Sequence, residues 1–168
     1  MSEPEEIFEL VDEEGRVTGT APRSECHRRP DLIHRSVHVF AMNRRGEVYL
    51  QLRSRSKDIQ PGRWDTSVGG HLVPGEGYRE AAAREMDEEL ALSGSLRFLY
   101  RYLWRTERES EMVETYLHVT EERPAPDPGE IEEGRFFAPL ELESLLEGDD
   151  VTPNLREELR RLRRAGEL

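Results

Sequence analysis

Three glutamates near the middle of the chain have the residue type and spacing of a divalent cation site. Glu85, Glu88 and Glu89 stand in the segment AREMDEEL, residues 83–90. On a helix, positions i, i+3 and i+4 share one face, so the three carboxylates would repel one another at a cost of roughly 0.2–0.5 kcal/mol per pair. Mg²⁺ prefers hard oxygen ligands, and clustered carboxylates supply them. The alternative is a solvated acidic face, and the residues before the helix decide between the two.

The three glutamates end a longer pattern, GGHLVPGEGYREAAAREMDEELAL. This segment resembles the Nudix box, the signature of hydrolases that act on nucleoside and other diphosphates linked to a second group. The box has eight fixed or class-restricted positions besides a glycine near its end, and all eight match, whereas Ala91 replaces that glycine. The resemblance implies that Gly70 lets a loop backbone pass close to a metal site, and that Glu76 is a structural partner near the helix start. We expect Ala91 to alter the helix exit rather than the chemistry.

In the family, the box forms a loop-helix-loop that binds Mg²⁺ or Mn²⁺. The resemblance implies that Glu88 and Glu89 are metal ligands. Glu85 would either join them or act as the base that activates water. Arg84 would orient a carboxylate rather than contact the substrate.

The sequence around the box resembles one Nudix branch, that of isopentenyl-diphosphate isomerase and its hydrolase-like relatives. The isomerases carry two histidines seven residues apart and then a WTNSVCGH-like strand. Here His27 and His34 keep that spacing, and WDTSVGGH places His71 at the third histidine. For two further acids on a later strand, the chain offers Glu109 and Glu111, with Glu114 as another candidate. The resemblance implies that the three histidines, Glu109 and Glu111 form a second metal site, suited to Zn²⁺ or Mn²⁺ as well as Mg²⁺. The alternative is that the histidines only hydrogen-bond loops together.

One position departs from the isomerase pattern. The isomerases have a cysteine that acts as a catalytic acid or base, and this chain has Gly69 there. Glycine cannot transfer a proton. The REXXEE pattern of the box, which the isomerases tend to lack in full, is complete here at residues 84–89. We therefore expect hydrolysis of a diphosphate linkage by attack of water on phosphorus. An isomerase and a catalytically silent diphosphate-binding sensor are the alternatives. The two remaining histidines, His38 and His118, lie in expected strands, and we assign neither to a site.

Basic residues follow the expected hairpin in QLRSRSKD. Arg53, Arg55 and Lys57 are candidates for phosphate contacts, and the alternative is an edge strand protected by charges. The chain has 24 basic and 36 acidic residues, a net charge of -12. Such a surface repels nucleic acid and anionic lipid, so we expect neither as a partner. The expected partner is a small-molecule diphosphate, and a homodimer stays open.

The composition and the order of the expected elements indicate a compartment and a fold class. Cys26 is the only cysteine in 168 residues, so no intrachain disulfide can form. We find no apolar run of membrane-spanning length and no signal peptide in MSEPEEIFEL, and we therefore expect a cytoplasmic protein. Strands and helices mix without strict alternation, which favours one α/β domain over residues 1–168. By the resemblance this is a Nudix fold, a mixed β-sheet sandwiched between α-helices.

Turn residues and hydrophobic periodicity give the expected elements. The most strongly patterned helix covers residues 78–90, with Ala82, Met86 and Leu90 in one apolar stripe. The last helix begins with Thr152 as N-cap and Pro153 at its first position. The other expected elements are two strands in 7–23, a hairpin in 36–54, a short strand in 66–72, strands in 94–106, 112–120 and 133–140, and a short helix in 140–148.

Overall fold

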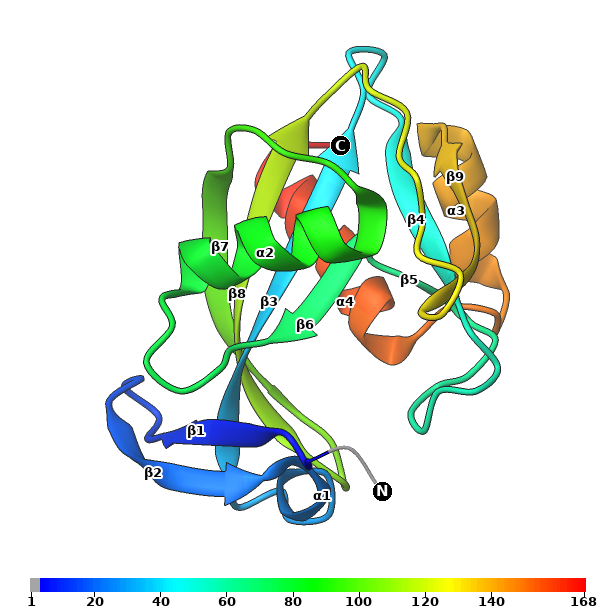
Figure 1. Cartoon of the computed structure of the whole chain (residues 1–168). Helices are drawn as coiled ribbons and strands as arrows, with labels where there is room; N and C mark the ends of the chain where they lie inside the picture. Colours follow the sequence, from blue (N-terminus) through cyan, green and yellow to red (C-terminus); the bar gives the residue numbers. More distant parts are fainter. Residues whose placement is uncertain (1–3) are drawn as a thin grey trace.

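The computed structural model describes residues 4–168, so the first three residues of the acidic N-terminal segment lie outside it. The expected fold class is confirmed: a mixed sheet lies between helices, with α2 on one face and α4 on the other (Figure 1). The strands are β1 Ile7–Val11, β2 Val17–Pro22, β3 Ile33–Met42, β4 Val48–Arg53, β5 Trp64–Asp65, β6 Val68–His71, β7 Arg97–Arg105, β8 Ser110–Val119 and β9 Ile131–Phe137. The helices are α1 Arg23–Cys26, α2 Tyr78–Leu90, α3 Pro139–Glu147 and α4 Pro153–Arg164.

Strand β3 is the centre of the sheet. It runs parallel to β8, with His34 opposite Glu111, and antiparallel to β6, with Ser36 opposite His71. The expected hairpin over residues 36–54 is present only at its tip, because β3 and β4 share a single pair, Met42 with Val48. Beyond that pair β4 leaves β3 and pairs with β9 and β5 instead.

The two faces of β3 form two separate cores. Val37 and Val39 face α2 and pack in one apolar cluster with Met86 and Leu90 of that helix. Phe40, the residue after Val39, points to the opposite face and packs with residues of α4 in another cluster. Burying such a side chain contributes roughly 1.5–3 kcal/mol. The alternation of side chains along β3 therefore holds one helix against each face of the sheet.

Helices α2 and α4 begin where the sequence predicts. The side chain of Thr152 accepts a hydrogen bond from the Leu155 amide at 3.1 Å and caps α4. Helix α2 covers residues 78–90 as expected and ends at Ala91, whose φ of 52° is left-handed. An alanine in that region costs roughly 1 kcal/mol, because its Cβ approaches the following carbonyl oxygen. The altered helix exit thus has a physical basis.

Two short elements were not expected, α1 and β5. Each is too short to leave a periodic pattern in the sequence. None of the helices within residues 4–168 is both long and apolar enough to cross a membrane.

Candidate active site

The three glutamates of α2 differ in their surroundings. Glu89 is 8% exposed, and its carboxylate accepts hydrogen bonds from Gln51 Nε2 at 2.9 Å and from the Gly69 amide at 3.4 Å. Burial, and then the charge of Glu85, raise the pKa of Glu89 to about 8. Burial also raises the pKa of Glu85, whereas the Glu88 side chain is 58% exposed. The shared helix face therefore runs from solvent into the interior.

Arg84 contacts carboxylates, as expected. Its guanidinium donates to both oxygens of Glu76, at 2.8 and 2.9 Å, and to Glu85 at 2.8 Å. The same group reaches Glu88 at 3.3 Å and the carbonyl oxygen of His71 at 3.0 Å. Arg84 thus ties the loop before α2 to the acidic face and fixes the direction of the carboxylates.

A divalent cation fits the chemistry of this face. A Cβ on Gly70 would overlap the Glu85 carboxyl group, so the glycine provides the room in which that carboxylate lies. Burial disfavours the charged forms of both Glu85 and Glu89, and the charge of Glu85 further disfavours that of Glu89. A cation bound between the two carboxylates would stabilise their charged forms and so offset the cost of burying them.

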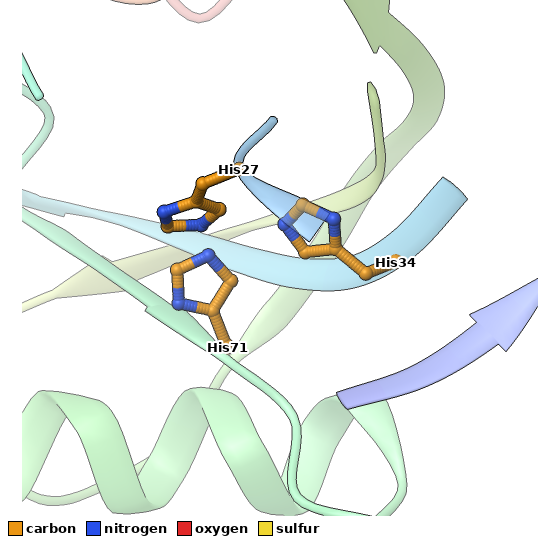
Figure 2. Close-up of side chains that lie close together, drawn as sticks. All are labelled: His27, His34 and His71. Atoms are coloured by element: carbon orange, nitrogen blue, oxygen red, sulfur yellow. The ribbon is translucent and has the colours of Figure 1, made fainter. Parts of the chain in front are cut away.

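The five residues of the expected second metal site lie together in space. They are His27, His34, His71, Glu109 and Glu111. Nε2 of His27 lies 3.2 Å from Glu109 Oε2. Nε2 of His34 and Nε2 of His71 lie 3.6 and 3.4 Å from Glu111 Oε1. Figure 2 shows the three rings pointing toward one another from β3, β6 and the residue after α1.

Strand register brings this cluster together. His34 and Glu111 are direct neighbours across β3 and β8, and His71 enters from β6 on the other side of β3. Phe8 of β1 stacks on His34 and His71, with ring centroids 5.1 and 4.4 Å apart. The N-terminal strand therefore covers one side of the cluster.

The cluster has the features of a donor set for one ion. Both ring nitrogens of His27 and of His34, and Oε2 of Glu109, are buried without a hydrogen-bond partner. Buried polar atoms seldom remain unpaired. Two donors at about 2.1 Å from one ion lie about 3.0 Å apart at a right angle and about 3.4 Å apart at the tetrahedral angle. The contacts of 3.2, 3.4 and 3.6 Å match that spacing. The residues therefore fit a metal ion.

The electrostatics of the cluster favour neutral imidazole, the form that binds metal. Burial, and then the charge of His71, lower the pKa of His27 to about 4. Burial, and then the charge of Glu111, raise the pKa of Glu109 to about 8. Burial also acts to raise the pKa of Glu111, but its contacts with His34 and His71 hold it well below the usual range.

A cavity of about 420 Å³ adjoins the cluster and reaches β6 at Gly69 and Gly70. Arg53 lies in its wall and is held by Asp65 at 3.1 Å. The structure does not bring the other two phosphate-binding candidates there. Arg55 is 84% exposed and faces Glu132, whereas Lys57 pairs with Glu130 and its charge also acts on Glu89. Phosphate contact by these residues stays a prediction, and Arg53 is the candidate that lines the cavity.

Sequence reasoning missed two arginines and one glutamine. Arg23 and Arg108 line the cavity, and Gln51 holds Glu89. Arg23 begins the short helix α1, four residues before His27, and α1 leaves no periodic pattern that could have pointed to it. The position of Gln51 depends on how β4 meets β6, for which the sequence carries no local signal.

Comparison with known proteins agrees with this geometry. The NUDIX domain family matches residues 32–160. An isopentenyl-diphosphate Δ-isomerase of Nocardia farcinica is 35% identical over 161 residues, 90% of this chain and 91% of that protein. An uncharacterised Nudix hydrolase of Pseudomonas aeruginosa is 34% identical over 135 residues, 80% of this chain and 79% of that protein. The crystal structure of DR0079 from Deinococcus radiodurans superposes with a TM-score of 0.81 at 30% identity, covering 93% of this chain and 98% of that one. The relatives thus include both isomerases and Nudix hydrolases.

Proposed function

The chain belongs to the NUDIX family, and we propose that it is a metal-dependent hydrolase that cleaves a diphosphate linkage by attack of water on phosphorus. The observation that carries the proposal is the burial of the Glu89 carboxylate beside Glu85. This burial raises the pKa of Glu89 to about 8. Carboxylates with strongly raised pKa values are typical of sites that bind a cation or transfer a proton.

The residues of the acidic face have separate tasks in this proposal. Glu88 and Glu89 hold Mg²⁺ or Mn²⁺, and Arg84 keeps Glu85 in place. A divalent cation, when bound, neutralises phosphate oxygens and lowers the pKa of a bound water. Glu85, with its raised pKa, either joins the ligands or accepts the proton of the attacking water.

The histidine cluster supports a second cation at His27, His34, His71, Glu109 and Glu111, on the evidence of its unpaired donors. Imidazole and carboxylate ligands together suit Mn²⁺ and Zn²⁺. Because the cluster adjoins the same cavity, an ion there would attract an anionic substrate to a chain of net charge -12. Arg23, Arg53 and Arg108 add positive charge to the cavity wall.

The cavity volume of about 420 Å³ suits a small molecule. We therefore propose a small-molecule diphosphate as the partner, and neither nucleic acid nor membrane. Whether the protein acts as a homodimer is a separate question for a sizing experiment.

Isomerisation of isopentenyl diphosphate is the second candidate, because several similar proteins are named as isomerases and share this length of chain. Gly69 argues against it, since it supplies no proton to carbon. Incubation with isopentenyl diphosphate in deuterated water discriminates between the two. Deuterium bound to carbon would establish the isomerase.

The direct test is a panel of diphosphate compounds incubated with Mg²⁺ and with Mn²⁺, followed by phosphorus NMR in ¹⁸O-labelled water to identify the attacked atom. We expect one class of compound to be cleaved, with ¹⁸O in a phosphate product. Glu88→Gln and Glu89→Gln should lower kcat at least about a hundredfold. Asp87→Asn, an exposed acid on the same helix, is the matched control. Full turnover in both glutamine variants would refute the proposal.

A further inference from the structure

The cavity contains a fourth histidine, which the proposed reaction does not yet use. His38 of β3 is 8% exposed and lines the cavity. Its ring faces Gly69, because a Cβ built on that glycine would lie 3.4 Å from His38 Cδ2 and 3.6 Å from His38 Nε2. The edge of the ring that carries Nε2 therefore borders the space that the missing side chain of Gly69 leaves open.

The opposite edge of the His38 ring is fixed by Glu158 of α4. Nδ1 of His38 lies 2.7 Å from Glu158 Oε1. Glu158 is fully buried and also accepts hydrogen bonds from the hydroxyls of Tyr100, Tyr102 and Thr115, at 2.5, 2.7 and 2.8 Å. Burial acts to raise the pKa of Glu158, but the bond from His38 and the tyrosine hydroxyls lower it. An ionised carboxylate only accepts, so Nδ1 carries the proton and Nε2 is left for the cavity.

A packing role alone does not account for this pair. Burying two ionisable groups costs several kcal/mol in desolvation, and apolar residues of similar size hold a helix to a sheet at least as well. His118 shows the cheaper solution in the same fold. It is also buried, but its Nδ1 meets only the carbonyl oxygen of Ser95 at 2.9 Å, and it does not line the cavity.

Gly69 also connects His38 to the acidic face. The Gly69 amide nitrogen lies 3.4 Å from Glu89 Oε2, and the direction in which a Gly69 side chain would point leads to the His38 ring. A diphosphate bound next to Glu89, with its leaving group in the cavity, would therefore lie beside His38.

We propose that His38 is a catalytic acid of this site and that Glu158 is its positioning residue. This inference rests on the proposed hydrolysis. Water forms a new bond to phosphorus and gives up a proton to Glu85 or to solvent, and the bond between phosphorus and the leaving oxygen breaks with its electron pair on that oxygen. The leaving oxygen takes the proton from His38 Nε2. Neutral His38 then regains a proton from solvent through the cavity.

The charges around His38 favour the protonated ring. Burial acts to lower its pKa, but the bond to Glu158 and its charge, then the charges of Asp65 and Glu111, raise it overall. The other titratable groups that face the pair are Tyr100 and Tyr102 of β7, which stay neutral because burial raises their pKa values. The acid is therefore present below the raised pKa, and it is lost as pH rises through that value.

The kinetic test uses the fastest-cleaved diphosphate of the panel with Mn²⁺. His38→Gln should lower kcat about a hundredfold, with a much smaller change in KM, and should abolish the fall of kcat at high pH. Glu158→Gln should move that fall to lower pH. His118→Gln is the matched control and should keep the wild-type pH profile. A wild-type kcat and profile in His38→Gln would overturn the proposal, as would deuterium on the carbon of isopentenyl diphosphate that depends on His38.

A second measurement does not depend on turnover. In ¹⁵N NMR of the metal-free protein, the neutral His38 ring should carry its proton on Nδ1, and Nε2 should take up a proton as pH is lowered from about 9 to about 5. Glu158→Gln should lower the midpoint. If no compound in the panel is cleaved, the proposed hydrolysis fails and the role of His38 fails with it. If a compound is cleaved but the spectra differ from this expectation, only the assignment of His38 fails. A ring that carries its proton on Nε2, or does not titrate, would refute the assignment.

Discussion

The two acidic clusters of this protein balance their charge in different ways. On α2, Arg84 lies against Glu85 and Glu88, and the acidic face is partly open to solvent. In the histidine cluster, His27 and His34 have buried nitrogens without hydrogen-bond partners. A buried donor set without partners favours an ion that stays, whereas a half-exposed set already paired with an arginine favours an ion that exchanges. We expect the cluster to keep its metal and α2 to take up its metal with substrate.

The largest expected effect concerns metal retention. After dialysis against a chelator, wild-type protein loaded with Mn²⁺ should keep close to one ion per chain. His34→Gln should keep none, because it removes a fully buried ligand. Glu89→Gln should keep the same ion as wild type and yet lose activity. Elemental analysis measures the ion content. Equal loss of metal in both variants would show that the two clusters form one site.

The next effect is on stability without metal. The pKa of Glu89 is raised to about 8 from 4.5, so the folded state binds the proton more tightly than the unfolded state does. Stability is therefore highest below about pH 4.5 for this group and falls as pH rises toward 8. At pH 8 with a chelator, Glu89→Gln should be more stable than wild type by about 2–4 kcal/mol.

Urea unfolding at pH 5 and pH 8 measures this difference. The gain should shrink at the lower pH, and Mn²⁺ should reduce it at the higher pH, since bound cation stabilises wild-type Glu89. Asp87→Asn, which is exposed, should show neither trend. A Glu89→Gln variant that is less stable than wild type at pH 8 would contradict the cost assigned to the buried carboxylate.

The sequence predicted local elements of both regions well and their surroundings poorly. Residues 78–90 form a helix because apolar spacing and helix-forming residues agree. That pattern cannot tell Glu88 from Glu89, since both lie on one face. Glu89 differs because Gln51 of β4 and the amide of Gly69 in β6 approach it in the folded structure. The histidine cluster followed from the family resemblance, because its members come from separate strands.

His38 shows the same limit. It stands four residues after His34 on one strand, so alternation puts both on the same face of the sheet. The residue that gives it a chemical role, Glu158, is 120 positions away in the chain. Conversely, Arg55 matched a family tendency, but the loop after β4 turns its side chain into solvent. Side chains beyond the end of a strand have no periodic rule to fix their direction.

A smaller effect is expected from Arg84→Lys. Lysine cannot donate in a fork to both oxygens of Glu76 while also reaching Glu85, as the guanidinium does. We expect Mn²⁺ binding at α2 to weaken by about 10- to 100-fold. Calorimetric titration of protein that already holds its cluster ion measures this change. Loss of the cluster ion in the same variant would show that Arg84 serves both regions through its bond to the His71 carbonyl.

The smallest expected effect is a change in stability from a substitution at the end of α2, far from the ligands of the histidine cluster. Ala91 ends α2 with φ of 52° and ψ of 37°, a left-handed conformation that glycine adopts without strain. Ala91→Gly should therefore stabilise the protein by roughly 0.5–1 kcal/mol, the relief of strain being partly offset by the greater freedom of glycine in the unfolded chain. Ala83→Gly, at an exposed position inside the same helix, is the matched control and should destabilise by about 1 kcal/mol. Thermal unfolding compares the two.

Neither substitution changes a residue of the histidine cluster, so both variants should keep the cluster ion. Altered stability with unchanged ion content would show that the two regions are held by different parts of the fold. If Ala91→Gly destabilises as much as Ala83→Gly, the helix exit is not left-handed and the strain assigned to it is absent.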